Sequence, residues 1–184
     1  MTVSRSAGLP PLAAEDHVCT SCGVSYGDLT VEDAVSRIRV VPDAVASAVA
    51  ALPDAALRRR PEPGVWSVLE YAAHVRDVYA TFLIRLHRAR TEDHPVLDPM
   101  FGDLRARRLR YNDLPVDAVL REVSLAAAGF CDEVADTADE EWGRRVRRLP
   151  GEDRTALWLV RHAMHEGVHH VRDVERVGAL AAGT

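Results

Sequence analysis

The sequence predicts an all-α protein built as a four-helix bundle, and three observations support this. Four long stretches carry apolar residues at the three- and four-residue spacing of an amphipathic helix. No stretch shows the convincing alternation of apolar and polar residues that is typical of a strand. The 184 residues suffice for one domain with a sizeable core, and four long helices in a chain of this size are typical of a bundle.

The start of the chain is expected to form an arm outside the bundle. Residues 1–16 contain Pro and Ala without periodicity, which predicts a mobile leader. A turn-rich segment follows, with the motif Cys19-Thr20-Ser21-Cys22-Gly23. We therefore expect a leader and CxxCG arm at residues 1–29 and a bundle at residues 30–184.

The first two helices are marked by their N-terminal caps. Thr30 and Asp33 form a capping box in its shorter-acid version, and helical periodicity continues to about residue 52. Pro42 lies inside that run and predicts a kink or break just before it. A full capping box from Ser67 to Glu70 opens the second helix, which is predicted to end near residue 87.

The second half of the chain carries the other two helices. A long charged stretch at residues 91–115 is expected to be partly ordered by short helices. The third helix is predicted over residues 116–135. The segment 144–150 could be extended, and Asp153 is the predicted cap of the fourth helix, which continues through Asp173.

Composition excludes several classes of protein. The mean hydropathy of −0.12 and the absence of an apolar run of about 20 residues argue against a membrane protein. The net charge of −5 gives no reason to expect nucleic-acid binding. The N-terminus lacks the apolar core of a signal peptide, and three cysteines do not form a disulfide framework, so we expect a cytoplasmic protein.

The fourth helix carries the strongest chemical signal. His165 and His169 lie four residues apart, so their imidazoles share one face and can bind one metal ion. A bundle site needs a third ligand from a neighbouring helix, and His74 in the second helix is the strongest candidate. His162 is a rival for that role. The remaining histidines look less well placed: His17, His87, His94 and His170.

Two motifs together resemble a known family. The run from Trp66 to Val75, which contains His74, and the run from His165 to His170 resemble the DinB-like superfamily in order and spacing over roughly residues 30–180. The resemblance implies a small four-helix bundle with a divalent metal held by three histidines, one on the second helix and an HxxxH pair on the fourth. It therefore implies His74, His165 and His169 as ligands of zinc or nickel.

The resemblance also suggests an activity. Many relatives look like metal-dependent transferases or isomerases that use a low-molecular-weight thiol such as mycothiol or bacillithiol. The expectation is therefore a thiol-dependent S-transferase or isomerase, with a small-molecule substrate and with a homodimer as a possible assembly. Glu166 and Arg172 are the catalytic candidates, because Arg172 could receive a carboxylate of substrate or thiol one turn beyond His169.

Two other functions remain open. His165-Glu166-Gly167-Val168-His169 has the HExxH form of a zinc protease, but the extended pattern fails at Arg172 and Glu175. A hydrolase that uses metal-activated water, with Glu166 or Asp173 as base, is less favoured. The other alternative is a non-catalytic metal- or ligand-binding bundle whose site is closed by the cysteine arm.

The role of Cys19 and Cys22 also stays open. A CxxCG motif supplies half of a structural zinc site, which needs four ligands, and His17, Cys131 or a second chain could complete it. A redox disulfide is a second option, and unliganded thiols are a third. The arm could also fold over the bundle and bring a thiolate near the histidine metal.

Overall fold

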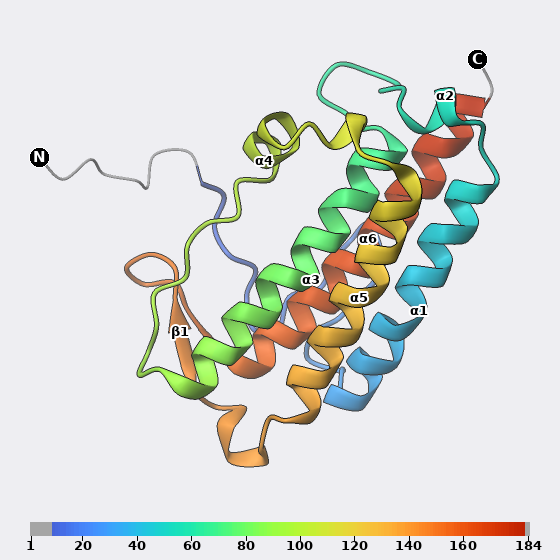
Figure 1. The fold of residues 1–184 in the computed structure, drawn as a ribbon. Helices are drawn as coiled ribbons and strands as arrows, with labels where there is room; N and C mark the ends of the chain where they lie inside the picture. The colour runs from blue at the N-terminus through green and yellow to red at the C-terminus, as the bar shows by residue number, and fades with distance from the viewer. Residues whose placement is uncertain (1–8, 183–184) are drawn as a thin grey trace, which may run out of the picture.

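Four long helices form the bundle that the sequence predicts. The computed structural model describes residues 9–182. Its long helices are α1 (Val31–Ala50), α3 (Val68–Thr91), α5 (Val116–Ala135) and α6 (Ala156–Ala182), shown in Figure 1. Helices α1 and α3 each pack against both α5 and α6, so α1 and α3 lie diagonally opposite each other. The four-helix bundle is thereby confirmed.

Short elements connect the long helices. The charged stretch after α3 is partly ordered by short helices, as expected, and the segment before α6 forms a small hairpin. The hairpin strands pair antiparallel, with Val146 opposite Arg154. In chain order these elements are α2 (Asp54–Leu57), α4 (Gly102–Arg108), η1 (Tyr111–Asp113), η2 (Asp139–Glu141), β1 (Arg145–Arg147) and β2 (Asp153–Thr155).

Both predicted capping boxes are present. The Thr30 hydroxyl accepts a hydrogen bond from the Asp33 N–H at 3.1 Å, and the Ser67 hydroxyl accepts one from the Glu70 N–H at 3.2 Å. Each acidic side chain in turn accepts from the N–H of its cap residue. These caps satisfy N–H groups that lack a partner in the first turn of a helix.

The cap of α6 is Thr155 and not Asp153. The Thr155 hydroxyl accepts a hydrogen bond from the Trp158 N–H at 3.0 Å. Asp153 belongs to β2, where its carboxylate pairs with His94 at 2.5 Å and with Arg147 at 3.1 Å. The strand pairing places Asp153 too far before the helix to cap it.

Helix α1 continues through Pro42, so the expected break before this residue does not occur. Proline removes one backbone N–H donor from the helix. The apolar face on both sides of it, which includes Ile38, Val41 and Val45, is fully buried in the bundle. Tertiary packing thus holds the helix together where local propensity predicts an interruption.

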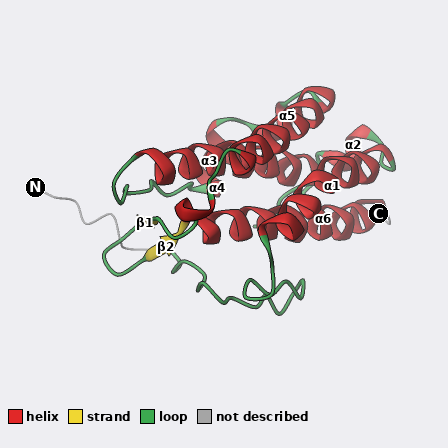
Figure 2. Cartoon of the chain, turned by 90° about the horizontal axis from the view of Figure 1, so that it is seen from below, coloured by secondary structure: helices red, strands yellow, loops and turns green. Residues whose placement is uncertain are grey.

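The arm before α1 lies along α6 (Figure 2). Arg154 donates to the carbonyl of Ala13 at 2.6 Å, and the Trp158 indole donates to the carbonyl of Ala14 at 3.2 Å. Farther along, Arg161 donates to the carbonyl of Leu29. The leader predicted over residues 1–16 is therefore hydrogen-bonded to the hairpin and to α6 from residue 10 on, whereas residues 1–8 lie outside the described part of the chain.

The CxxCG motif forms a tight turn within the arm. The Cys19 N–H donates to the carbonyl of Val24 at 2.9 Å, and the Gly23 N–H donates to the carbonyl of Cys19 at 2.8 Å. Gly23 has a φ of +75°, in the left-handed region that favours glycine. The turn directs both cysteine side chains inward, and both are buried.

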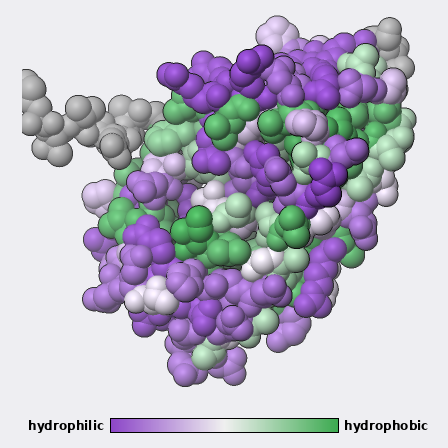
Figure 3. All heavy atoms as spheres, viewed as in Figure 1, coloured by the Kyte–Doolittle hydropathy of each residue, from purple (hydrophilic) through white to green (hydrophobic). Residues whose placement is uncertain are grey.

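No helix in residues 9–182 is long and apolar enough to cross a membrane. On the face drawn in Figure 3, hydrophobic patches lie between hydrophilic side chains. Large exposed apolar residues include Ile84, Phe101 and Leu125. The homodimer suggested by the sequence stays a prediction.

Gly167 allows α3 and α6 to approach closely. A Cβ atom at this position would lie 1.9 Å from the Tyr79 hydroxyl oxygen, which is fully buried. We predict that Gly167→Ala lowers the free energy of unfolding by about 1–3 kcal/mol through overpacking. Thermal or denaturant unfolding measures this loss.

Gly129→Ala in α5 is the matched control. Its added methyl would meet only the flexible end of Leu83, at 3.2 Å, and alanine is the better helix former by about 1 kcal/mol. We expect stability within about 1 kcal/mol of the parent. Equal destabilisation by both substitutions would contradict the close approach at Gly167.

Candidate metal centres

Helix α6 presents metal-binding side chains on two adjacent faces. Consecutive residues of an α-helix are rotated by about 100°, whereas residues four apart differ by only about 40°. His165 and His169 therefore share one face, which is turned toward the arm. Glu166 and His170 share the next face, which is turned toward α3.

The first cluster joins α3 to α6. His74, Glu166 and His170 each offer one ligand atom, and these atoms lie within 4.8 Å of one another. The Glu166 carboxylate is 3.9 Å from His74 Nε2 and 3.5 Å from His170 Nε2. The other ring nitrogen of His170, Nδ1, lies 3.0 Å from Asp173. The imidazoles of His74 and His170 and the carboxylate of Glu166 thus converge. The Asp173 carboxylate contacts the other side of the His170 ring.

The pKa shifts in this cluster favour ionised Glu166 and neutral His74, which are the forms that bind a metal ion. Burial opposes ionisation of Glu166, but His170 and His74 outweigh it and hold the pKa of that carboxyl well below its usual range. Burial lowers the pKa of His74, which favours its neutral, ligating form. Burial would also lower the pKa of His170, but Asp173 and Glu166 raise it to about 9. A metal ion would therefore displace a proton from His170.

Aromatic side chains and α4 form the walls around this cluster. The Trp66 ring lies 4.9 Å from the His74 ring, and the Tyr71 ring lies 5.4 Å from the His170 ring. At the start of α4, a Cβ on Gly102 would come within 3.0 Å of Trp66 and 3.4 Å of His74. The glycine thus lets the first residue of α4 lie directly against the His74 imidazole.

The second cluster joins the arm to α6. Cys19, Cys22, His165 and His169 offer four ligand atoms within 4.8 Å of one another. Cys19 Sγ lies 3.7 Å from His169 Nδ1. Burial raises the pKa of Cys19, but hydrogen bonds from Cys22 and Ser21 and the charge of Arg172 outweigh it, so its pKa is lowered. Two thiols and two imidazoles are the donors of a Cys2His2 site.

Tyr26 supports the second cluster from the side of the bundle. Its buried hydroxyl lies 2.8 Å from His162 Nδ1 and 2.9 Å from His165 Nδ1. His162 stacks on Trp158, and burial lowers the pKa of both histidines to about 4. A third group, His162, His165 and Glu166, also lies within 4.8 Å. We interpret His162 as a support for its neighbours, because its ring stacks on Trp158 while its two nitrogens face Tyr26 and Glu166.

Asp173 contacts one histidine of each cluster. Its carboxylate is 3.6 Å from His169 Nε2 and 3.0 Å from His170 Nδ1. It also accepts a hydrogen bond from Arg176 at 2.9 Å. A carboxylate on the far nitrogen of a ligating imidazole fixes the orientation of the ring and raises its basicity. One residue thus orients one histidine of each cluster.

The structure divides the three predicted metal ligands between the two clusters. His74 gathers with Glu166 and His170, whereas His165 and His169 gather with the arm. The pair that gathers with His74 is Glu166 and His170. It has the same four-residue spacing as the predicted pair, His165 and His169, but each member lies one residue later in the sequence. His169 and His170 are consecutive residues of a helix, so their side chains point in different directions. The presence of two adjacent histidines was therefore the signal in the sequence for two separate sites.

The predicted catalytic residues also occupy different places. Glu166 lies inside the first cluster, where it is a potential ligand. Arg172 lies on the arm side and donates to the carbonyl of Ser21 at 3.2 Å. Sequence reasoning did not find the role of Tyr26, whose contacts arise only when the arm folds back over some 140 residues.

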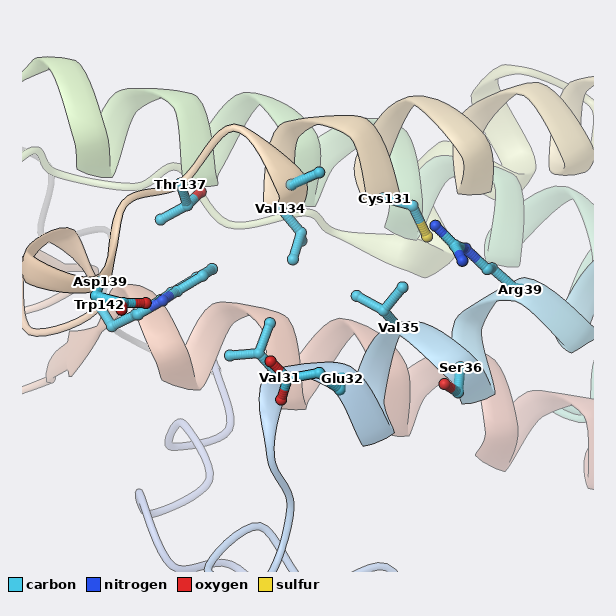
Figure 4. A pocket seen from close by; sticks show the side chains of 11 residues that line it. Val31, Glu32, Val35, Ser36, Arg39, Cys131, Val134, Thr137, Asp139 and Trp142 are labelled. Carbon is cyan, nitrogen blue, oxygen red and sulfur yellow. The ribbon is translucent and has the colours of Figure 1, made fainter.

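A separate pocket lies at the opposite edge of the bundle, between α1 and α5 (Figure 4). It has a volume of about 510 Å³, and it is lined by Val31, Arg39, Cys131 and Trp142 among others. Burial raises the pKa of Cys131, so this thiol stays protonated. Cys131 lines this pocket and does not gather with Cys19 and Cys22, so it does not complete the CxxCG motif, and no residue of either metal cluster lines the pocket.

Both donor sets fit a divalent metal. In the first cluster the fit rests on the donor chemistry, since two imidazoles and an ionised carboxylate suit zinc, nickel or iron. In the second it rests on His165 Nε2, a buried atom with no hydrogen-bond partner among the described residues. A three-residue set leaves coordination positions open, whereas a four-residue set is closed.

Comparisons with known proteins identify the family of the chain. The family model of the DinB superfamily matches residues 37–174. A Geobacillus thermodenitrificans (strain NG80-2) protein named "Putative metal-dependent hydrolase" is 30% identical over 90 residues, which are 49% of this chain and 51% of that protein. The chain thus spans about half the length of this curated relative.

Two solved structures share the fold. YfiT from Bacillus subtilis, described as a probable metal-dependent hydrolase with an unusual four-helix bundle topology, has 18% identity and a TM-score of 0.68, over 79% of this chain and 86% of that one. The mycothiol-dependent maleylpyruvate isomerase has 16% identity and a TM-score of 0.66, over 82% of this chain and 63% of that one. Since the family model covers most of the sequence and the bundle is shared, the chain belongs to the DinB superfamily.

Proposed function

We propose that the protein is a metal-dependent enzyme whose metal is held by His74, Glu166 and His170, and which acts on a small molecule by means of a low-molecular-weight thiol. The observation that carries this proposal is the convergence of these three side chains, from α3 and α6, within 4.8 Å. Of the three ligands implied by the family resemblance, the proposed set retains His74. It replaces His165 and His169 by Glu166 and His170, which face α3.

The ligand number supports a catalytic site. Catalytic metal sites in proteins are typically held by three side chains and keep a position for water or substrate, and a divalent metal there lowers the pKa of a bound thiol or water. Trp66 and Tyr71 supply apolar walls next to His74 and His170. Such walls exclude water and suit a small organic substrate. A cytoplasmic location fits a reduced thiol as co-substrate.

Thiol chemistry is favoured by the fold shared with the mycothiol-dependent isomerase. Water is the second candidate nucleophile, favoured by the hydrolase descriptions of YfiT and the Geobacillus protein. In the proposed site Glu166 is a ligand and is not free to act as a base. The third alternative, a site closed by the arm, is disfavoured, because Cys19 and Cys22 gather with His165 rather than with His74.

The metal prediction concerns His74 and His170. We predict that His74→Ala or His170→Ala removes most of the metal bound at the first cluster, measured by elemental analysis after dialysis. His87→Ala is the control, because His87 is an exposed histidine of the same helix α3 that pairs with Glu133. Full metal retention in both variants would rule out this ligand set.

The thiol prediction uses cobalt as a spectroscopic probe. In a Cys19→Ser/Cys22→Ser background loaded with Co²⁺, mycothiol or bacillithiol is expected to produce a thiolate-to-cobalt absorption band. The same background with His74→Ala should give no band. If the thiols produce no band while the loaded protein hydrolyses ester or amide substrates, water is the nucleophile and the thiol proposal fails.

Asp173 provides a test of how the site is supported. Because its carboxylate holds His170 Nδ1 at 3.0 Å, we predict that Asp173→Asn weakens metal binding about 10- to 100-fold. Competition with a chelator of known affinity measures this change. Glu175→Gln, two residues away on the exposed side of α6, should leave the affinity unchanged.

A further inference from the structure

We propose that Cys19, Cys22, His165 and His169 form a second, closed metal site, which binds a structural zinc ion and fastens the N-terminal arm to α6. This site is separate from the proposed catalytic metal. It shares no ligand with His74, Glu166 and His170.

The geometry of the four donors matches tetrahedral zinc. Zinc–sulfur bonds of about 2.3 Å and zinc–nitrogen bonds of about 2.0–2.1 Å place a sulfur and a nitrogen about 3.6 Å apart on a tetrahedron. Cys19 Sγ and His169 Nδ1 are 3.7 Å apart. All four donor atoms lie within 4.8 Å of one another, so small side-chain adjustments suffice to complete the tetrahedron.

The hydrogen bonds around His165 leave a lone pair for the metal. Tyr26 has one hydroxyl proton and contacts His162 Nδ1 and His165 Nδ1. If His165 donates its Nδ1–H to the tyrosine oxygen, the tyrosine can donate its own proton to His162. His165 Nε2 then carries a lone pair, and this atom is buried without a hydrogen-bond partner in residues 9–182. A metal ion satisfies it.

His169 is oriented in the complementary way. Its Nε2 faces the Asp173 carboxylate at 3.6 Å, while its Nδ1 faces Cys19 Sγ. A neutral ring that carries its proton on Nε2 directs that proton to Asp173 and its lone pair to the sulfur side. Both histidines can therefore adopt the tautomer that a metal requires.

Charge balance favours zinc in this buried place. Both cysteine side chains are buried, as is His165. On binding, the two thiols release their protons to solvent, and the two thiolates neutralise the charge of Zn²⁺. The resulting Cys2His2 site is neutral, which removes the penalty for burying an isolated charge.

The site connects parts of the chain that are 150 residues apart. The CxxCG turn has a backbone conformation that suits this site, because Gly23 lies in the left-handed region and both cysteine side chains are buried. Arg172 adds a hydrogen bond to the Ser21 carbonyl at the edge of the same turn. Four protein ligands leave no open position, so the role of the ion is to hold the arm and not to react.

The first experiment compares metal content and cobalt spectra of full-length variants. Wild type loaded with Co²⁺ is expected to show thiolate-to-cobalt absorption without any added thiol. Cys19→Ser/Cys22→Ser should lose this band and one metal equivalent, whereas Cys131→Ser and His74→Ala should retain the band. His17→Ala is the control for a nearby histidine outside the cluster, and it should also retain the band.

A second measurement uses proteins with both cysteines intact. In a Cys131→Ser background, Cys19 and Cys22 should resist a thiol reagent until a strong chelator removes the metal, and the chelator should lower the melting temperature. Prompt reaction of both thiols before chelation, or an isolated Cys19–Cys22 disulfide, would overturn the proposal. Loss of metal only in His74→Ala would also overturn it and leave the catalytic proposal standing.

Discussion

The rotation of about 100° between consecutive residues of α6 determines how this protein can bind metal. The sequence from His165 to His170 carries four potential ligands in six positions. The side chains of His165 and His169 face the arm, whereas those of Glu166 and His170 face α3. One rigid element thus fixes the two donor sets relative to each other.

The close packing of α3 on α6 makes the first of these sets possible. Gly167 follows Glu166 and faces Tyr79, and the absence of its side chain lets the two helices approach. His74, one and a half turns before Tyr79, then reaches Glu166 and His170. The negative charge of half-buried Glu166 is stabilised by these two histidines. In the absence of metal, a protonated His170 between Glu166 and Asp173 serves the same electrostatic purpose.

The sequence predicted the fold well because the fold depends on local signals. Apolar periodicity located the four helices, and the capping boxes at Thr30 and Ser67 located two of their starts. The break before Pro42 failed because packing of the surrounding apolar face outweighs the lost hydrogen bond. Asp153 is not the cap, because it pairs with Arg147 in the hairpin and its carboxylate contacts His94, which lies 59 residues earlier in the chain.

The site was predicted in its residue types but not in its grouping. The helical periodicity of α6 identified the face of His165 and His169, but only the fold shows that this face meets the arm. The return of Tyr26 and Cys19 onto α6 is a long-range contact without a local signal. The adjacent pair at 169 and 170 carried the relevant information, since neighbouring residues on a helix face different partners.

Anomalous diffraction at the zinc absorption edge, from crystals of the metal-loaded wild-type protein, tests the account most directly. Two peaks are predicted: one surrounded by Cys19, Cys22, His165 and His169, and a second between His74, Glu166 and His170. A single peak coordinated by His74, His165 and His169 together would contradict the division of α6 into two metal-binding faces.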